Sequence, residues 1–263
     1  NTNYGINTDA GDTFTSNVIQ NNGGFGIDTN TGNFFTSNTV SNNSGFGINT
    51  DAGDTFDSNI IENNDQWGIN TDTGNYFTSN TVSSNGNYGI NTDAGDTFEL
   101  NVIENNQGYG IDTDTGNIFS ENTVSNNSGW GINTDAGELF DSNIVLSNTQ
   151  HGIDTNTGNS FTNNTISNNS TDGLIVSPGD SLSISLSGNT FEGNMQNGLS
   201  ADITTDISID SDIFSLNKNN AIVIQGNATS VTIANVIIAG DLEHNYGSST
   251  PSGSENGLRI LNA

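Results

Sequence analysis

The sequence has no cysteine and very few basic residues. Two Lys or Arg residues stand against 30 Asp or Glu residues, which gives a formal net charge of −28. Without cysteine, neither a disulfide framework nor a thiolate metal site can form. The negative charge excludes nucleic acid and anionic membranes as partners, since both would be repelled, and it favours divalent cations or a basic surface instead. Apolar runs are far shorter than the roughly 20 residues that span a bilayer, so no membrane insertion is expected.

Hydrophobic residues are also scarce, at 30%, and composition alone would suit a disordered chain. A strict repeat contradicts disorder. The Ile of a Gly-Ile pair recurs every 21 residues, at Ile6, Ile27, Ile48, Ile69, Ile90, Ile111, Ile132 and Ile153. Odd copies read like NTDAGDTF and even copies like DTNTGNFF, which indicates a 42-residue unit of duplication. Such periods are typical of solenoids.

The repeat predicts an all-β fold, a parallel β-helix or β-solenoid. Each copy holds three short β-like pieces, which are bounded by Gly and Asn and whose apolar residues are spaced by two. One coil cannot bury these residues alone, but coils stacked about 4.8 Å apart form columns of identical side chains. We expect eight regular 21-residue coils over residues 1–168. About three irregular coils, with a candidate cap and a last strand at Leu258 to Leu261, are expected over residues 169–263.

Four columns are recognisable from the repeat. The column that begins at Phe14 predicts a core of stacked rings, and the Asn column that begins at Asn17 predicts a ladder of side-chain amides. The Gly column from Gly11 to Gly158 indicates a turn with positive φ. A fourth column is aromatic from Tyr4 onward and is expected to be a core or half-exposed stack, with a sugar-stacking platform as the alternative.

The pattern F-x-x-N-x-[VI]-x-x-N, followed by an aromatic residue and Gly-Ile, resembles the repeat of the pectate-lyase-like superfamily. The resemblance implies a right-handed parallel β-helix. It also implies kinship with polysaccharide lyases, polygalacturonases, alginate epimerases and many surface proteins. It covers residues 1–168 strongly and the remainder weakly.

The machinery that this resemblance would imply for an enzyme is not found. Lyases of the superfamily use Arg or Lys, but only Lys218 and Arg259 are present, and both are expected to be surface or capping charges. The stretch NTDAGD from Asn7 is similar to a polygalacturonase motif but lacks its Gly-His-Gly and its basic clamp. His151 is interpreted as a substituted member of the aromatic column, and His244 lies in a polar loop. We therefore expect no enzymatic activity.

Acidic residues recur at outward and turn positions of the coils. Stacked carboxylates repel one another unless cations or alternating Asn residues relieve the repulsion, and oxygen-rich turns suit Ca²⁺. A calcium-binding set and a merely solvated acidic face both remain open. The candidate metal ligands are Asp9, Asp12, Asp51, Asp54, Asp93, Asp96, Asp112, Asp114, Asp135 and Glu138.

The resulting expectation is a non-catalytic extracellular or cell-surface module, structural or adhesive, stabilised by Ca²⁺. Coil edges free for pairing suggest end-to-end self-association into filaments or a matrix. One alternative is a polysaccharide-binding or -processing β-helix, similar to a lyase or epimerase. Another is ice binding by a flat face that alternates Thr with aliphatic residues. This candidate ligand face comprises Val18, Thr39, Ile60, Thr81, Val102, Thr123, Ile144 and Thr165.

Overall fold

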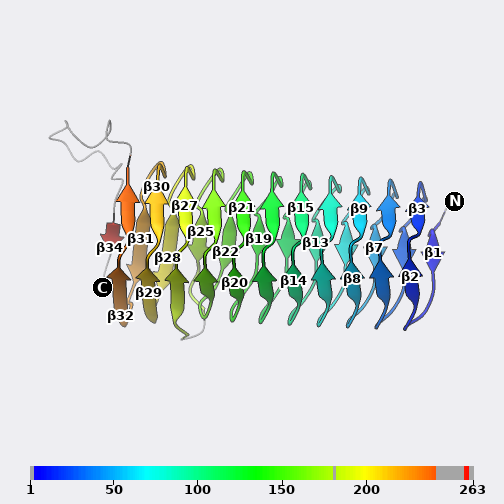
Figure 1. Cartoon of the computed structure of the whole chain (residues 1–263), viewed down its shortest axis with the longest axis horizontal. Helices are drawn as coiled ribbons and strands as arrows, with labels where there is room; N and C mark the ends of the chain where they lie inside the picture. The colour runs from blue at the N-terminus through cyan, green and yellow to red at the C-terminus, as the bar shows by residue number, and fades with distance from the viewer. Residues whose placement is uncertain (1–2, 180–181, 241–257, 261–263) are drawn as a thin grey trace.

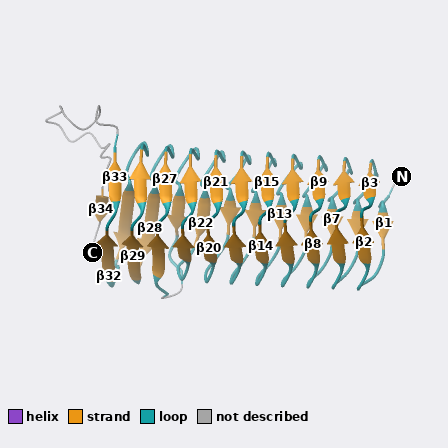
Figure 2. Cartoon of the chain, viewed as in Figure 1, coloured by secondary structure: helices purple, strands orange, loops and turns teal. Residues whose placement is uncertain are grey.

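The structure, a computed structural model, describes residues 3–179, 182–240 and 258–260 of the chain. His244 and the polar stretch around it lie outside the described residues, and only the backbone is described at Arg259. The chain winds into a long stack of coils with three faces, and the two ends lie at opposite ends of the long axis (Figure 1). Strands and connecting loops make up the described part, without a helix (Figure 2).

Three parallel sheets run along the axis, and each coil contributes one strand to each sheet. Sheet A contains β1 (Ile6–Asn7), β4 (Ile27–Asp28), β7 (Ile48–Asn49), β10 (Ile69–Asn70), β13 (Ile90–Asn91), β16 (Ile111–Asp112), β19 (Ile132–Asn133), β22 (Ile153–Thr155), β25 (Leu174–Val176), β28 (Leu199–Ile203), β31 (Ile222–Gly226) and β34 (Leu258–Ile260). Sheet B contains β2 (Thr13–Thr15), β5 (Phe34–Thr36), β8 (Thr55–Asp57), β11 (Tyr76–Thr78), β14 (Thr97–Glu99), β17 (Ile118–Ser120), β20 (Leu139–Asp141), β23 (Ser160–Thr162), β26 (Ile184–Ser187), β29 (Asp206–Asp210) and β32 (Ser230–Ala234). Sheet C contains β3 (Val18–Gln20), β6 (Thr39–Ser41), β9 (Ile60–Glu62), β12 (Thr81–Ser83), β15 (Val102–Glu104), β18 (Thr123–Ser125), β21 (Ile144–Leu146), β24 (Thr165–Ser167), β27 (Thr190–Glu192), β30 (Ile213–Ser215) and β33 (Ile237–Ala239).

This architecture confirms the predicted parallel β-solenoid. Strands that neighbour each other in a sheet are one coil apart in sequence, and Ile6 pairs with Ile27 as the 21-residue repeat requires. No helix long and apolar enough to cross a membrane occurs in the described ranges. After residue 168 the coils lengthen: Leu174 pairs with Leu199 and Leu199 with Ile222. The final strand, β34, pairs in parallel with β31.

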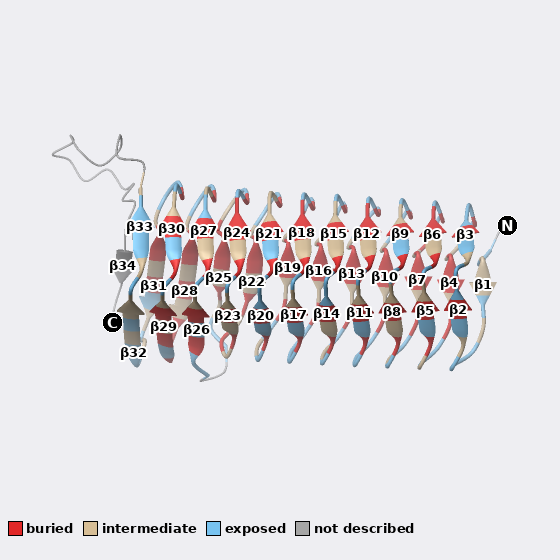
Figure 3. Ribbon diagram, viewed as in Figure 1, coloured by how far each residue is buried: buried red, intermediate tan, exposed pale blue. Residues whose placement is uncertain are grey.

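The core holds one inward column from each sheet (Figure 3). In the regular coils the central residue of each short strand in sheets B and C is buried and its two neighbours face outward, as strand alternation dictates, whereas all three residues of β33 are exposed. The Phe column of sheet B stacks with ring centroids 4.6 to 5.0 Å apart from Phe14 to Phe161. Such columns bury aromatic and aliphatic area in every coil, and this burial stabilises the solenoid.

Amide ladders satisfy the backbone at the corners between sheets. In the predicted column, Asn38 accepts the backbone N–H of Asn17 at 3.0 Å, and its own amide donates to Asn59 at 3.0 Å. The same arrangement repeats at a second column, which begins at Asn22 and was not predicted as a ladder. The buried amides at these corners are therefore paired, and the cost of burying unpaired polar groups is avoided.

Glycine is required at two places in each of the eight regular coils. The Gly11 column adopts positive φ, from 73° at Gly32 to 92° at Gly158, as its sequence predicts. The glycine before each Ile of sheet A meets the next coil closely. A Cβ added at Gly26 would lie 2.5 Å from the carbonyl oxygen of Gly47, so only glycine fits there.

Candidate functional site

The aromatic column lies at the corner that leads into sheet A. Its members from Phe25 to Trp130 stack almost in parallel with centroids 4.6 to 5.8 Å apart. Each ring therefore covers the face of the next, and the half-buried column presents ring edges to solvent. At His151 the regular stack ends, because this ring lies 6.0 Å from Trp130 and is tilted by 46°.

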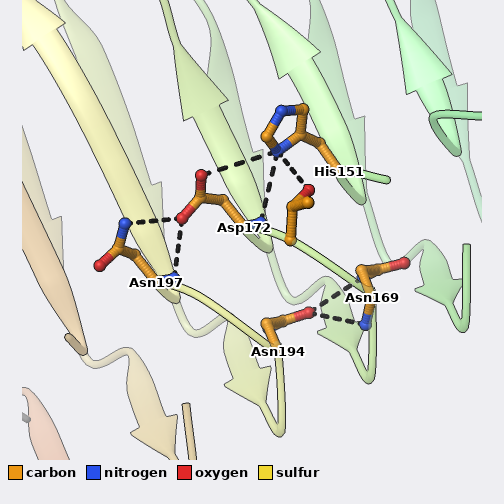
Figure 4. Close-up of polar contacts among 6 residues, drawn as sticks. His151, Asn169, Asp172, Asn194 and Asn197 are labelled. Atoms are coloured by element: carbon orange, nitrogen blue, oxygen red, sulfur yellow. Dashed lines mark hydrogen bonds and ion pairs between the residues drawn. The ribbon is translucent and has the colours of Figure 1, made fainter. Parts of the chain in front are cut away.

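His151 contacts the residue that follows it in the column, Asp172 (Figure 4). The imidazole Nδ1 lies 3.6 Å from the Asp172 carboxylate and 2.7 Å from the Thr171 hydroxyl. The Asp172 carboxylate also accepts the backbone N–H and the side-chain amide of Asn197, both at 2.7 Å. These bonds hold a nearly buried carboxylate in one orientation beside the imidazole.

The tautomer of His151 follows from its partners. The backbone N–H of Asp172 donates to Nδ1 at 3.3 Å, so Nδ1 accepts and the ring proton is on Nε2. Burial lowers the pKa of His151, and the charge of Asp172 only partly offsets this effect. The ring is therefore neutral at pH 7 and presents Nε2–H as a donor. In Figure 4 the second ring nitrogen points away from the Asp172 contacts.

Asp154 lies three residues after His151, in β22, and faces outward from sheet A between Asn133 and Ile175 of the adjoining strands. Burial raises the pKa of its carboxyl to about 6, with a further contribution from the charge of Asp172. A carboxyl group with that pKa exchanges a proton readily near neutral pH.

Asp112 occupies the same outward column two coils earlier. Burial raises its pKa, while a hydrogen bond of 2.6 Å from the Asn133 amide favours its ionised form. Two coils separate the Asp112 and Asp154 strands by about 9.6 Å along the axis. Tyr109 lies near both carboxylates, and its pKa is raised by burial and then by neighbouring charges that include both of them.

The candidate acid–base site comprises Asp112, Asp154, His151 and Asp172, with Asp172 close enough for its charge to raise the pKa of Asp154. Its two outward carboxyl groups differ in environment: burial raises the pKa of Asp112 but a hydrogen bond from the Asn133 amide opposes this, whereas burial and the charge of Asp172 raise the pKa of Asp154 to about 6. Such a difference assigns one carboxyl as acid and the other as base. Lys218 is the only Lys or Arg side chain that the structure describes.

The candidate metal ligands divide into two groups. Asp54, Asp96 and Glu138 are buried at the corner before sheet B, and Asp12 is half-buried there. Their carboxylates belong to a third ladder that alternates with Asn. In it, the Asp54 carboxylate accepts the backbone N–H of Asn33 at 2.6 Å, and the backbone N–H of Asp54 donates to Asn75 at 2.9 Å. These carboxylates therefore already bind the backbone.

The other candidates face solvent, except that Asp112 is half-buried in the acid–base site. Asp51, Asp93, Asp114 and Asp135, with Asp72 between the first two, make a run of exposed carboxylates on consecutive coils. Asp9 lies in the same column. Over the described ranges, no group of three or more His, Cys, Asp or Glu residues is arranged to hold a metal ion. Calcium binding stays a prediction.

The candidate ligand face lies on the outside of sheet C. Its Thr residues are half-buried, and Val18, Ile60 and Ile144 are exposed. Adjacent coils pair in register along the column, as Val18 does with Thr39, so the face is straight. Its role stays a prediction.

Sequence reasoning found Asp112 but interpreted it as a metal ligand, and it did not assign a role to Asp154 or Asp172. It noted His151 as an exception in the aromatic column and dismissed it as a base. A signal was present: Asp172 follows His151 by one 21-residue step, so two successive members of an aromatic column are ionisable. Such a departure from a regular repeat indicates a position at which packing alone does not determine the residue type.

Comparison with known proteins supports the fold. The family described as the right-handed β-helix region matches residues 1–128, 68–210 and 113–257. The A-module of the mannuronan C-5 epimerase AlgE4 of Azotobacter vinelandii is similar in structure, with a TM-score of 0.62 and 12% identity over 97% of this chain and 87% of that one. A mutant of the periplasmic alginate epimerase AlgG has a TM-score of 0.55 and 13% identity over 89% of this chain and 70% of that one.

A third similar structure is the catalytic domain of a GH87 α-1,3-glucanase in complex with nigerose. Its TM-score is 0.53 at 14% identity, over 98% of this chain and 63% of that one. Among proteins with curated descriptions, none matches the sequence. Identities this low establish a shared fold and not a shared substrate.

The comparisons correct two expectations. A non-catalytic structural, adhesive or filament-forming module was expected, but the similar solved structures described above are two epimerases and a glucanase catalytic domain. The expectation that the chain is not an enzyme is contradicted by the same finding. The alternative of a polysaccharide-binding or -processing β-helix agrees better with it. Because the matched regions together run from residue 1 to residue 257, the chain belongs to the right-handed β-helix family.

Proposed function

We propose that this protein hydrolyses a polysaccharide at the acid–base site formed by Asp112, Asp154, His151 and Asp172. The observation that carries the proposal is the pair of outward carboxyl groups two coils apart beside the His151–Asp172 contact. Inverting glycosidases use two carboxyl groups roughly 6.5–9.5 Å apart, with room for a water molecule between base and sugar. Two coils place the Asp112 and Asp154 strands about 9.6 Å apart along the axis, at the upper edge of that range.

In the proposed reaction, protonated Asp154 gives its proton to the glycosidic oxygen as the bond to the anomeric carbon breaks. Ionised Asp112 takes a proton from the water that attacks the same carbon from the opposite side. The anomeric configuration is inverted, and solvent exchange restores the two protonation states. His151 donates a hydrogen bond from Nε2 to the sugar, and the backbone N–H of Asp172 and the Thr171 hydroxyl orient the imidazole by donating to Nδ1.

The substrate class follows from charge. A net charge of −28 opposes the approach of uronate polymers, and Lys218 is the only Lys or Arg among the described side chains. We therefore propose a neutral or basic polysaccharide, in contrast to the mannuronan and alginate named for the two epimerases. An extracellular or cell-surface location agrees with such a polymer and with the periplasmic relative.

The test is release of reducing ends from a panel of neutral, amino and uronate polysaccharides, with the anomer of the first product assigned by NMR. We expect Asp154→Asn and Asp112→Asn each to lower kcat by about 10²- to 10⁴-fold, since general acid–base groups contribute effects of that size. Asp28→Asn is the matched control, because Asp28 lies in the same outward column near the other end. It should retain activity.

The pH profile supplies a second readout. Asp154 must be protonated to act as the acid, so activity should fall as the pH rises through about 6, the pKa of its carboxyl. A wild-type protein that cleaves no polysaccharide in the panel, or an Asp154→Asn variant with full activity, would contradict the proposal.

A further inference from the structure

The outward surface of sheet B carries a large apolar side chain on every second coil from β5 to β17, and Leu139 of β20 follows Ile118 on the next coil. Phe34 is 53% exposed, Tyr76 57% and Ile118 44%. Between them lie the half-buried Thr55 and Thr97. Strand pairing sets Thr55 directly between Phe34 and Tyr76, so the three side chains follow the solenoid axis in order.

The rings of Phe34 and Tyr76 differ from those of the Phe and aromatic columns. In those columns each ring stacks on the next coil at about 5 Å, and its faces are covered. Phe34 and Tyr76 are two coils apart, about 9.6 Å, which is too far for one ring to cover the other. Phe34 and Tyr76 therefore both stay exposed, with the shorter, half-buried Thr55 between them.

A companion column on the same surface supplies carboxylates with the same two-coil period. Asp57, Glu99 and Asp141 point outward two residues after the Thr55, Thr97 and Leu139 positions. Asp57 is flanked by Thr36 and Thr78 of the adjoining coils. Every two coils thus present one large apolar side chain, one carboxylate and at least one hydroxyl, a combination that matches the apolar face and the polar rim of a sugar ring.

We propose that this outer surface of sheet B binds a polysaccharide that carries amino groups, with a sugar ring over Thr55 between Phe34 and Tyr76 and its ammonium group at Asp57. The polymer lies along the solenoid axis. The site deepens the proposed function, on which it rests for the expectation that the ligand is a polysaccharide, and it lies on a different sheet from the acid–base site.

Charge decides the class of polysaccharide. The whole chain is strongly negative, so a cationic polymer is attracted and a uronate polymer repelled. An ammonium group gains from a carboxylate and from the face of an aromatic ring together, whereas a neutral sugar gains nothing from the charge of the periodic carboxylates. The candidate ligand face on sheet C offers aliphatic residues in place of rings at the equivalent positions.

The test measures binding by calorimetry with the Asp154→Asn protein, which removes the proposed acid and leaves sheet B unchanged. The probes are a β-1,4-linked glucosamine oligomer, its fully N-acetylated form and an oligogalacturonate. We expect the glucosamine oligomer to bind at least ten times more tightly than the acetylated form, and the oligogalacturonate not to bind. Tyr76→Ala should weaken binding at least tenfold, and Asp57→Asn should weaken it and flatten its salt dependence.

Met195→Ala, an exposed change in the loop after β27, is the control and should leave the Kd unchanged. Equal affinity for the acetylated and free-amine oligomers, or unchanged binding after Tyr76→Ala, would overturn the proposal. The two proposals fail separately: binding to sheet B without hydrolysis by the wild type contradicts only the acid–base site. Hydrolysis that does not change on Tyr76→Ala, with no calorimetric binding, contradicts only the sheet B site.

Discussion

At the scale of single residues, the corner between sheets B and C requires a left-handed backbone in every regular coil. Most coils place Ser there, with φ near 55°, and Leu100 occupies the same position with φ of 57° while its side chain is 47% exposed. A left-handed conformation costs an ordinary L-residue about 1 kcal/mol, but Asn tolerates it through local hydrogen bonds. Leu100 therefore lowers the stability of its corner without burying its side chain.

We predict that Leu100→Asn raises the free energy of unfolding by about 0.5–1 kcal/mol, because it relieves this conformation. Urea unfolding followed by circular dichroism measures the change. Ile144→Asn, an exposed change in β21, serves as control and should not stabilise. A Leu100→Asn protein no more stable than the wild type would show that the Leu side chain stabilises this corner by contacts that outweigh the strain.

At the scale of the structural element, the corner before sheet B is a ladder in which carboxylates alternate with amides. Asn75 donates its backbone N–H and its amide to the Asp96 carboxylate, at 2.7 and 3.0 Å. An ionised Asp96 has no proton to donate to Asn117 in turn, although its backbone N–H does so at 2.8 Å. Each carboxylate therefore interrupts a chain of side-chain donors that Asn would continue.

Protonation of Asp96 should stabilise the protein. Burial raises the pKa of Asp96 to about 6 in the folded state, well above its ordinary value, so the folded chain takes up a proton before the unfolded chain does. Stability therefore rises as the pH falls from about 6 to about 4, and it is lost again as the pH rises through 6. We therefore expect the thermal midpoint of unfolding to be higher at pH 5 than at pH 7.

The matched variant is Asp96→Asn, which keeps the acceptor and adds the missing donor. At pH 7 it should be more stable than the wild type by about 1–3 kcal/mol, and the difference should shrink toward pH 4. Equal midpoints at pH 7, or a difference that does not change with pH, would mean that Asp96 is not the group that titrates.

The three corners show how far sequence could predict such elements. An unbroken column of Asn predicts a ladder of side-chain hydrogen bonds, because the same residue in every coil can make the same bond to the next coil. The column that begins at Asp12 alternates Asp with Asn, and in sequence it resembles an exposed acidic turn. Strand alternation sets side-chain direction within strands but not at corners, so the burial of Asp54 and Asp96 could not be derived from it.

At the scale of the whole molecule, excess negative charge is spread over many coils. Five exposed carboxylates, Asp51, Asp72, Asp93, Asp114 and Asp135, stand on consecutive coils about 4.8 Å apart. Their repulsion affects Asp93. The pKa of its carboxyl is raised first by burial and then by the charges of Asp72 and Asp114. The carboxylates lie closer together in the folded state than in the unfolded chain, so their repulsion lowers the stability of the folded state.

We predict that Ca²⁺ raises the thermal midpoint more than NaCl at the same ionic strength. A divalent ion between carboxylates of neighbouring coils binds the folded chain and not the unfolded one, and this difference stabilises by linkage. A calcium titration with a chelator as zero point measures it. Equal shifts in Ca²⁺ and in NaCl would reduce the acidic columns to a solvated face.

Repetition determines what could be predicted about the molecule as a whole. Regular columns predicted the coil length, the three sheets and the core, because every coil repeats the same contacts. The acid–base site depends on the exceptions, His151 and Asp172, and on contacts between coils. A residue that departs from the repeat once cannot be recognised from periodicity. The expectation of a non-catalytic protein was therefore based on the regular coils alone.

Odd and even coils alternate along the solenoid, so its surface pattern repeats every two coils, a step of about 9.6 Å. The carboxylates on sheet B recur at every second coil from Asp57 to Asp141, so the gain or loss of one coil among them would bring two like coils together and break this order. Duplication or deletion of 42 residues would leave every junction unchanged. Length in this protein can therefore evolve in steps of about 9.6 Å, and a longer version would bind more units of the same polymer without any new kind of contact.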